Sequence, residues 1–223
     1  LGVDALDILH LHDFDYGGGA FEAQALGEGF ATLHALKAEG VVRAVGAGIY
    51  AMDLWKRVLT EVDLDVILLH NHHTLCDLRA FELLPLTQAK GIGVINAAPF
   101  ASGLLTGNAP PAWHPASAEA RQVFADAAAR ADELGVPIAK LALAYSAQEE
   151  RLPVTLFSCA RPEVLRPNLA WAAEPFDPRA VALVQRVPEP VSNRQWPYAA
   201  LPVAASPPPE APPRAYPASA LDF

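Results

Sequence analysis

Residues Gly91–Ser117, GIGVINAAPFASGLLTGNAPPAWHPAS, run from a buried strand directly into a loop suited to hold a ligand. The apolar run Val94–Ala98, bounded by glycines before it and Pro99 after it, is typical of a strand covered on both faces, as in a parallel sheet. Small residues follow and predict exposed backbone N–H groups in a loop longer than a simple connection: Ala101, Ser102, Gly103 and Gly107. Loops at the carboxyl ends of parallel strands are where α/β proteins bind ligands.

Composition limits the class of protein. The chain has 223 residues, is 52% hydrophobic and carries a net charge of −9, so it can form a substantial core in one domain. The negative charge argues against nucleic acid or an anionic membrane as a main partner. No apolar run reaches the roughly 18 residues of a membrane span, and no leader opens the chain. Cys76 and Cys159 are expected to be reduced core thiols, and the protein to be soluble and cytoplasmic.

Strand and helix patterns alternate along the chain. Strands are predicted at residues 8–11, 41–46, 66–69, 94–97 and 154–157. The predicted helices are one through Leu26, Phe30 and Leu33 that stops at Gly40; 52–59; 78–89; one capped by Ser117 with Val123, Ala127, Ala131 and Leu134 inward; one from Pro137 with Ile138, Leu141, Ala142 and Tyr145 inward; and one through Leu165, Leu169 and Ala172. This alternation predicts a parallel sheet, as most of a (β/α)₈ barrel or as a five-stranded open sheet.

Two features concern the ends of the chain. Residue 1 is Leu within a strand-like segment, so we expect that something upstream is missing. Residues 1–198 form the predicted domain, and residues 199–223 form a Pro/Ala-rich tail. Such a composition predicts a disordered or polyproline-like segment outside the core, with a ligand for a proline-recognition domain as the less favoured alternative.

The first predicted strand ends in two histidines. In DILHLHD (Asp7–Asp13), alternation places Ile8, His10 and His12 on one face. A histidine at the carboxyl end of a barrel strand can donate a hydrogen bond to a substrate oxygen, the polarisation that hydride transfer needs. Taken alone, this position favours a structural histidine over a catalytic one.

A second histidine cluster, His70-Asn71-His72-His73, follows the third strand. Alternation sends His70 and His72 one way and His73 the other, and no nearby carboxylate or cysteine completes a metal site, so we expect no metal. A polar contact from Asn71 or His70 to a ligand is favoured instead. No G-x-G-x-x-G fingerprint, P-loop or G-x-S-x-G elbow occurs, which argues against Rossmann dinucleotide-binding proteins, P-loop enzymes and serine hydrolases.

Several segments together resemble the aldo-keto reductases: DILHLHD, LHALKAEGVVRAVGAGIY, DVILLHNHHTL, GIGVINAAPFASGLLTG and a late NLAW. The segments PPAWHPAS, KLALAYS and EPVSNRQWP resemble the branch of L-galactose dehydrogenase and related aldose 1-dehydrogenases. The resemblance spans residues 1 to about 198. It implies a (β/α)₈ TIM barrel lacking the first three βα units and an NAD or NADP cofactor across its carboxyl face. It also implies oxidation of a small sugar, an aldose such as L-galactose, at C1 to the lactone.

The resemblance also implies roles for individual residues. His12 falls on the active-site histidine that orients the substrate oxygen. Asn71, or His70 beside it, falls where a polar side chain holds the nicotinamide carboxamide, and Gly48 falls at a second such contact. The loop that wraps the cofactor pyrophosphate corresponds to Pro99, Phe100, Ser102, Gly103, Leu104 and Leu105. Arg161 corresponds to a residue near the adenosine phosphate, and Asn168 to one that contacts adenine.

Other positions depart from the family pattern. Gly48-Ile49 stands where many members carry Ser-Asn or Thr-Gly, and Ala97 replaces an aromatic residue that stacks on nicotinamide. Pro167 falls inside the helix that carries Asn168, so that helix is expected to begin near Pro167. The family's catalytic Asp, Tyr and Lys come from the first three units, upstream of Leu1.

We therefore expect a fragment of an NAD(P)-dependent aldose dehydrogenase that, alone, binds cofactor poorly and oxidises no sugar. One alternative is a catalytically inactive barrel remnant that acts as a binding or regulatory subunit. Another is a different barrel enzyme, such as a lyase or isomerase. The sequence does not indicate the oligomeric state.

Overall fold

Five parallel strands form one sheet in the order in which they occur along the chain. The computed structural model describes residues 2–159 and 161–198; the predicted tail, residues 199–223, lies outside them. The strands are β1 (Leu6–His12), β2 (Val42–Ile49), β3 (Val66–His70), β4 (Gly93–Ala97) and β5 (Val154–Leu156). Each strand pairs in parallel with the next. Because an open doubly wound sheet reverses its strand order at a switch point, this consecutive order favours the barrel arrangement.

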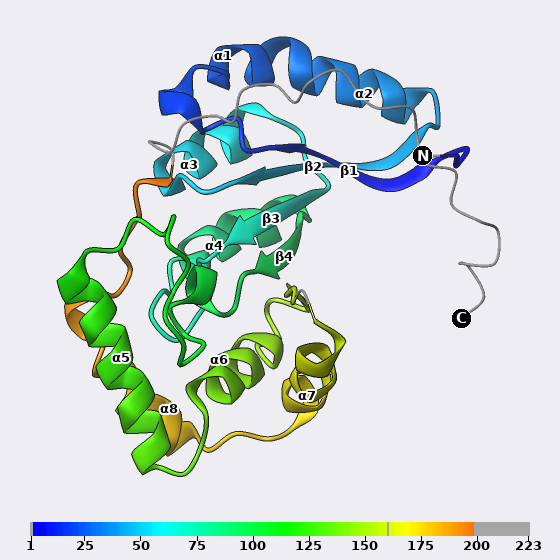
Figure 1. Cartoon of the computed structure of the whole chain (residues 1–223). Coiled ribbons are helices and arrows are strands. Elements are labelled where there is room, and N and C mark those ends of the chain that lie inside the picture. Colours follow the sequence, from blue (N-terminus) through cyan, green and yellow to red (C-terminus); the bar gives the residue numbers. More distant parts are fainter. Residues whose placement is uncertain (1, 160, 199–223) are drawn as a thin grey trace.

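The helices follow the strands and lie along one side of the curved sheet (Figure 1). They are α1 (Glu22–Gln24), α2 (Phe30–Ala38), α3 (Met52–Glu61), α4 (Ala80–Lys90), α5 (Ala118–Glu133), α6 (Ile138–Ala147), α7 (Pro162–Ala173) and α8 (Pro178–Gln185). A π-helical turn (Ala25–Gly29) joins α1 to α2, and 3₁₀ turns occur at Gly17–Gly19, Ala101–Gly103 and Glu189–Val191. Among the described helices, none has the length and apolar character needed to cross a bilayer.

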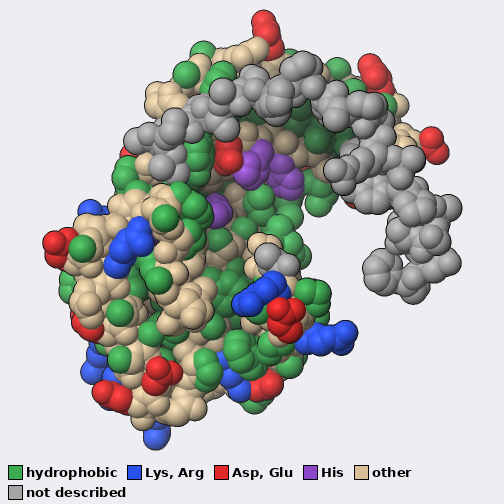
Figure 2. Space-filling view, viewed as in Figure 1, with side chains coloured by type: hydrophobic (Ala, Val, Ile, Leu, Met, Phe, Trp, Pro, Cys, Tyr) green, Lys and Arg blue, Asp and Glu red, His purple; other side chains and the backbone are tan. Residues whose placement is uncertain are grey.

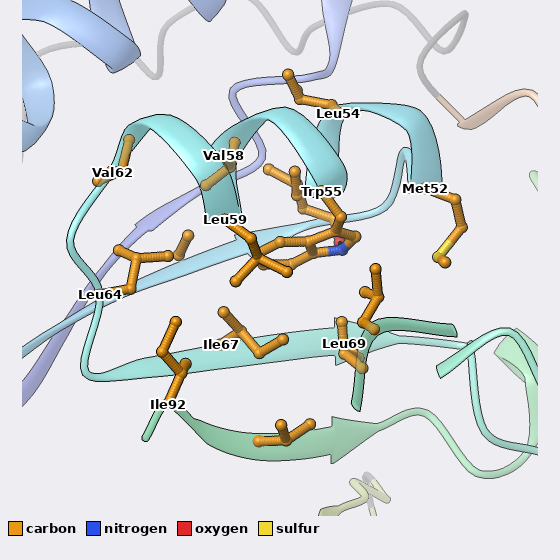
Figure 3. Packing of buried hydrophobic residues seen from close by; sticks show 14 of the residues in the cluster. Met52, Leu54, Trp55, Val58, Leu59, Val62, Leu64, Ile67, Leu69 and Ile92 are labelled. Carbon is orange, nitrogen blue, oxygen red and sulfur yellow. Dashed lines mark hydrogen bonds between the residues drawn. The ribbon is translucent and has the colours of Figure 1, made fainter. Parts of the chain in front are cut away.

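The outer face of the sheet carries the main core, which Figure 3 shows beneath α3. Trp55 and Leu59 of α3 lie over Ile67 and Leu69 of β3, and all four are fully buried. Each such side chain contributes roughly 1.5–3 kcal/mol on burial. Alternate residues of β2 face this core, so the intervening residues face the inside of the curve.

The inner face of the sheet is shaped by glycines opposite histidines. A β-carbon added at Gly46 would lie 2.5 Å from Cδ2 of His10, and one at Gly48 would lie 2.5 Å from Cδ2 of His12. The two glycines of β2 therefore make room for the imidazole rings of β1 on this face. In Figure 2, histidine side chains gather in the hollow of the same surface.

Some details of the predicted helices are wrong. The helix α7 runs through Pro167, so Asn168 lies within it and is buried. The proline removes one helical hydrogen bond, to the carbonyl of the exposed residue Glu163, which water can reach. Leu165 and Leu169, through which this helix was predicted, have exposed fractions of 39% and 56%, because α7 packs against α6 through the side that carries Asn168.

Two further helix details differ. In α5, Phe124 lies inward and Leu134 lies outside the helix with 36% exposure, whereas Ser117 caps the helix as expected by accepting a hydrogen bond from the N–H of Ala120. Helix α8 was not predicted from the sequence; Asp177 caps its N-terminus by accepting from the N–H of Arg179. Both thiols are free, Cys76 buried and Cys159 partly so.

His73 is buried between α4 and α6. Its ring stacks on Tyr145, with centroids 5.0 Å apart, and lies 5.0 Å from the ring of Phe81. Burial lowers the pKa of His73 from 6.5 to about 4. The folded protein therefore holds this ring in its neutral form at pH values where the unfolded chain would protonate it.

We expect Gly46→Ala to lower the free energy of unfolding by about 1–3 kcal/mol, because the new methyl group overlaps the His10 ring and Cγ1 of Val66, 2.9 Å away. Denaturant unfolding measures this change. Gly27→Ala is the control, because Gly27 has nothing within 4 Å of an added β-carbon; it should be neutral or stabilise the protein by up to about 1 kcal/mol. Equal effects of the two substitutions would contradict the proposed contact.

We expect stability to fall as the pH drops from about 6.5 towards 4, because unfolding then takes up a proton at His73. His73→Phe should remove about 2 kcal/mol of this loss between pH 7.5 and 4.5. Urea unfolding at a series of pH values measures the slope. Tyr145→Phe keeps His73 and should keep the wild-type slope; an unchanged slope in His73→Phe would contradict the assignment.

Candidate functional site

The carboxyl ends of the strands share one edge, and three of the turns that leave them are left-handed. Asp13, Asn71 and Ala98 follow β1, β3 and β4 directly, with φ values of 54°, 64° and 60°. Non-glycine residues adopt this conformation at an energetic cost, and such residues concentrate at functional sites. At each of these three strand ends the chain turns sharply, so that the next residues lie over the edge of the sheet.

A cavity of about 730 Å³ opens at this edge. Five residues that the resemblance assigned to the cofactor line it: His70, Pro99, Phe100, Ser102 and Gly103. The end of β5 and the segment of Trp113 supply other walls. The structure thus brings together the predicted residues of β3 and of the loop after β4.

A polar cluster includes two residues that line this cavity, His70 and Ser102, and a third that does not, Asn71. The Asn71 amide nitrogen donates a hydrogen bond to Oγ of Ser102 at 2.8 Å, and Nε2 of His70 lies 3.3 Å from the same oxygen. Burial lowers the pKa of His70 from 6.5 to about 4, helped by nearby His72. Near pH 7 the His70 ring is therefore neutral and able to accept a hydrogen bond from the Ser102 hydroxyl.

The cluster fits a nicotinamide carboxamide. Asn71 is 4% exposed, and its Oδ1 has no hydrogen-bond partner among the described residues. A buried amide oxygen without a partner costs about 1–3 kcal/mol, which a ligand N–H group would remove. The cavity beside it has the size of a small-molecule site.

The loop after β4 differs from the expectation of free backbone N–H groups. Ala101, Gly103, Leu104 and Leu105 donate their N–H groups to carbonyl oxygens of Ala98, Phe100 or Ala101, within the loop. The side chains of Leu104 and Leu105 are buried in the core between α5, α6 and α8. These four N–H groups are therefore used to close the turn, and Ser102 is the residue of this loop whose side-chain hydroxyl joins the polar cluster.

His12 lies at the end of β1, with half of its side chain exposed. Its Nδ1 is 3.2 Å from a carboxylate oxygen of Asp13, and this hydrogen bond raises the pKa of His12 above 6.5. The Nε2 edge of the ring lies over Gly48, whose missing side chain leaves room for it. Gly48 therefore positions His12. Neither residue lines the 730 Å³ cavity; His12 lines a separate hollow with Asp13 and Phe14, so its catalytic role stays a prediction.

His72, which follows His70 in the cluster, is held by contacts within the protein. His72 donates from Nε2 to the carbonyl oxygen of Tyr50 at 2.7 Å, and its Nδ1 lies 3.6 Å from Asp77. The expectation that no carboxylate is near was thus wrong, because a tight turn returns Asp77 to the cluster. Arg79 binds the Asp77 carboxylate at 2.6 Å, and within the described residues no group of metal-binding side chains occurs.

The two residues assigned to the adenosine end lie in α7. Arg161 precedes the helix, is exposed and lies 3.7 Å from Glu163. Asn168 is buried within the helix. Neither lines the 730 Å³ cavity, so their roles stay predictions.

The sequence reasoning missed two residues that the structure adds to the site. The hydroxyl of Tyr198 lies 3.4 Å from the Asn71 amide nitrogen and 2.8 Å from Nε2 of His114. Both tie the cluster to segments far away in the chain. The only available signal was that they lie in or beside PPAWHPAS and EPVSNRQWP, two segments that carry the resemblance.

Comparisons with known proteins agree with this geometry. L-galactose dehydrogenase of Arabidopsis thaliana is 36% identical over 204 residues, which are 88% of this chain and 63% of that protein. Pyridoxal 4-dehydrogenase of Microbacterium luteolum is 30% identical over 77% of this chain and 53% of its own length. The solved structure of an aldo-keto reductase from Bacillus halodurans, in its holo form, superposes with a TM-score of 0.62 at 20% identity, over 83% of this chain and 59% of that one.

The chain thus spans less than two thirds of the length of these relatives. The fold they share is the (β/α)₈ barrel, of which the five parallel strands here form a part. Residues 1–189 match the Aldo/keto reductase family. The chain therefore belongs to the aldo/keto reductase family.

Proposed function

We propose that this chain carries the cofactor-binding part of an NAD(P)-dependent oxidoreductase that oxidises an aldose at C1 to the lactone. The hydrogen-bonded cluster of His70, Asn71 and Ser102, of which His70 and Ser102 line the cavity, is the observation that carries the proposal. It offers a nicotinamide amide one buried acceptor that nothing else among the described residues uses. The family and its relatives, which are oxidoreductases by name, support the same reaction class.

Each residue of the edge has a chemical task in this proposal. Asn71 binds the carboxamide, and Ser102 holds Asn71. His12 holds the oxygen of the sugar hydroxyl at Nε2, while Asp13 fixes its Nδ1. The nicotinamide, when bound, supplies the acceptor for the hydride that leaves the carbon.

An aldose is the proposed substrate because L-galactose dehydrogenase matches at the higher identity and over more of this chain than pyridoxal 4-dehydrogenase. Of the family's acid–base residues, the resemblance identifies only His12 in this chain. A single histidine can orient a substrate oxygen, but the proton and the hydride leave the substrate from different atoms and need separately placed groups. We therefore propose that the 223-residue chain binds the cofactor weakly and does not oxidise sugar.

Cofactor binding tests the proposal. Titration of the 223-residue chain with NAD⁺ and with NADP⁺, followed by NMR chemical shifts, should show saturable binding at residues around the 730 Å³ cavity. Ser102→Ala should weaken binding by about 3- to 10-fold, because it removes the hydrogen bond that holds Asn71. Thr60→Ala removes a hydroxyl from the exposed side of α3 and should leave binding unchanged. Absence of binding by both dinucleotides would refute the proposal.

Turnover is a separate test. With L-galactose and either oxidised cofactor, we expect no increase in absorbance of the reduced nicotinamide above the buffer control. Pyridoxal, offered in parallel, should give the same result. Sustained oxidation of L-galactose would show that this chain holds a complete acid–base site, and oxidation of pyridoxal alone would overturn the proposed substrate class.

A further inference from the structure

We propose that Tyr198 and His114 are positioning residues that hold the Asn71 amide with its oxygen turned towards the nicotinamide carboxamide. This inference rests on the proposed function and adds two residues to its cofactor site. Neither was assigned by the resemblance. Both come from segments far from β3 in the sequence.

The three side chains form a continuous buried series of hydrogen bonds. Nε2 of His114 lies 2.8 Å from the Tyr198 hydroxyl oxygen, and that oxygen lies 3.4 Å from Nδ2 of Asn71. The exposed fractions of His114, Tyr198 and Asn71 are 3%, 2% and 4%. Hydrogen bonds sealed from water in this way fix orientation, because a broken bond is not replaced by one to solvent.

The direction of the hydrogen bonds follows from the backbone around His114. The N–H of Ala116 donates to Nδ1 of His114 at 3.1 Å, so Nδ1 carries no proton. Burial and nearby Arg121 lower the pKa of His114 to about 4, which leaves a neutral ring with its proton on Nε2. That proton points at the oxygen of Tyr198, which is therefore an acceptor towards His114.

The phenol oxygen has two lone pairs, and His114 uses one. The other accepts from Asn71 Nδ2, whose second hydrogen goes to Ser102 Oγ at 2.8 Å. Both amide hydrogens of Asn71 are then engaged, and Oδ1 is left without a partner among the described residues. In this orientation the Ser102 hydroxyl can also donate to Nε2 of His70, and Oδ1 of Asn71 stays available to a ligand donor.

The two positioning residues are themselves fixed. Arg121 of α5 donates to the carbonyl oxygens of Ala116, at 2.9 Å, and His114, which holds the loop on the helix. The ring of Tyr198 packs edge-on against Tyr50, with centroids 4.7 Å apart. Side chains whose own positions are set by packing and further hydrogen bonds are the ones able to position a ligand-binding group.

The test separates the two ends of the cofactor. ADP-ribose lacks the nicotinamide, so it does not touch Asn71 in the proposed arrangement, whereas NAD⁺ or NADP⁺ does. Tyr198→Phe in the full 223-residue chain should lower the affinity for the dinucleotide that binds better by about 3- to 10-fold. It should change the affinity for ADP-ribose by less than twofold. Tyr145→Phe, the same chemical change beside His73, should alter neither affinity.

His114 is tested with a pair of variants. His114→Leu removes the donor to Tyr198 and should reproduce the selective loss for the dinucleotide. His114→Gln keeps an N–H donor and should recover at least half of that loss. Equal loss for ADP-ribose in these variants would indicate a merely structural role and overturn the inference.

A measurement without cofactor checks the orientation directly. The two Asn71 side-chain amide protons should give separate, slowly exchanging NMR signals in the wild type, and Tyr198→Phe should shift one of them strongly. Unshifted signals, or equal dinucleotide affinity in wild type and Tyr198→Phe, would overturn the inference and leave the proposed function standing. If the wild type bound ADP-ribose and neither dinucleotide, or none of the three, both would fall.

Discussion

The site depends on one backbone hydrogen bond that is made just after the end of a strand. The first residue after a strand donates its N–H to a carbonyl oxygen near the end of the adjacent strand. Asp13 donates to Gly48 at 2.8 Å, Asn71 to Ala97 at 3.1 Å, and Ala98 to Leu156 at 3.2 Å. The parallel ladder thus continues one residue past the strands. These bonds fix the position of the first loop residue after β1, β3 and β4 relative to the neighbouring strand.

The same three residues carry left-handed φ angles, which cost roughly 1–2 kcal/mol each for residues other than glycine. Asp and Asn tolerate this conformation better than Ala, so Ala98 is the most strained of them. The ladder bonds offset part of the cost. The left-handed conformation ends the strand abruptly at Asn71. The Asn71 side chain then lies within hydrogen-bond distance of Ser102 in the loop after β4, and Ser102 is left-handed as well.

The sequence predicted the elements that depend on short-range patterns. Alternation and buried runs located all five strands and placed His12 and His70 at strand ends. Of these two histidines, His70 lines the 730 Å³ cavity. The sequence did not predict features that depend on contacts between residues far apart in the chain. Which side of α7 faces inward is set by its packing against α6, and no local pattern indicates that Leu165 and Leu169 lie exposed. The partners of Asn71 include Tyr198, 127 residues away, and no local pattern shows that pairing.

The histidines at this edge are of two kinds, which burial on one side and a hydrogen bond to a carboxylate on the other distinguish. The nicotinamide ring of an oxidised cofactor is cationic, so an imidazolium beside it would weaken binding. His70 and His114 are held neutral by burial, with pKa values lowered to about 4. His12, half exposed and hydrogen-bonded to Asp13, has its pKa raised instead, and the carboxylate balances the charge of the ring when it is protonated. In the proposed arrangement, burial keeps the histidine beside the cofactor neutral, whereas the hydrogen bond to Asp13 favours the charged form of His12 beside the sugar.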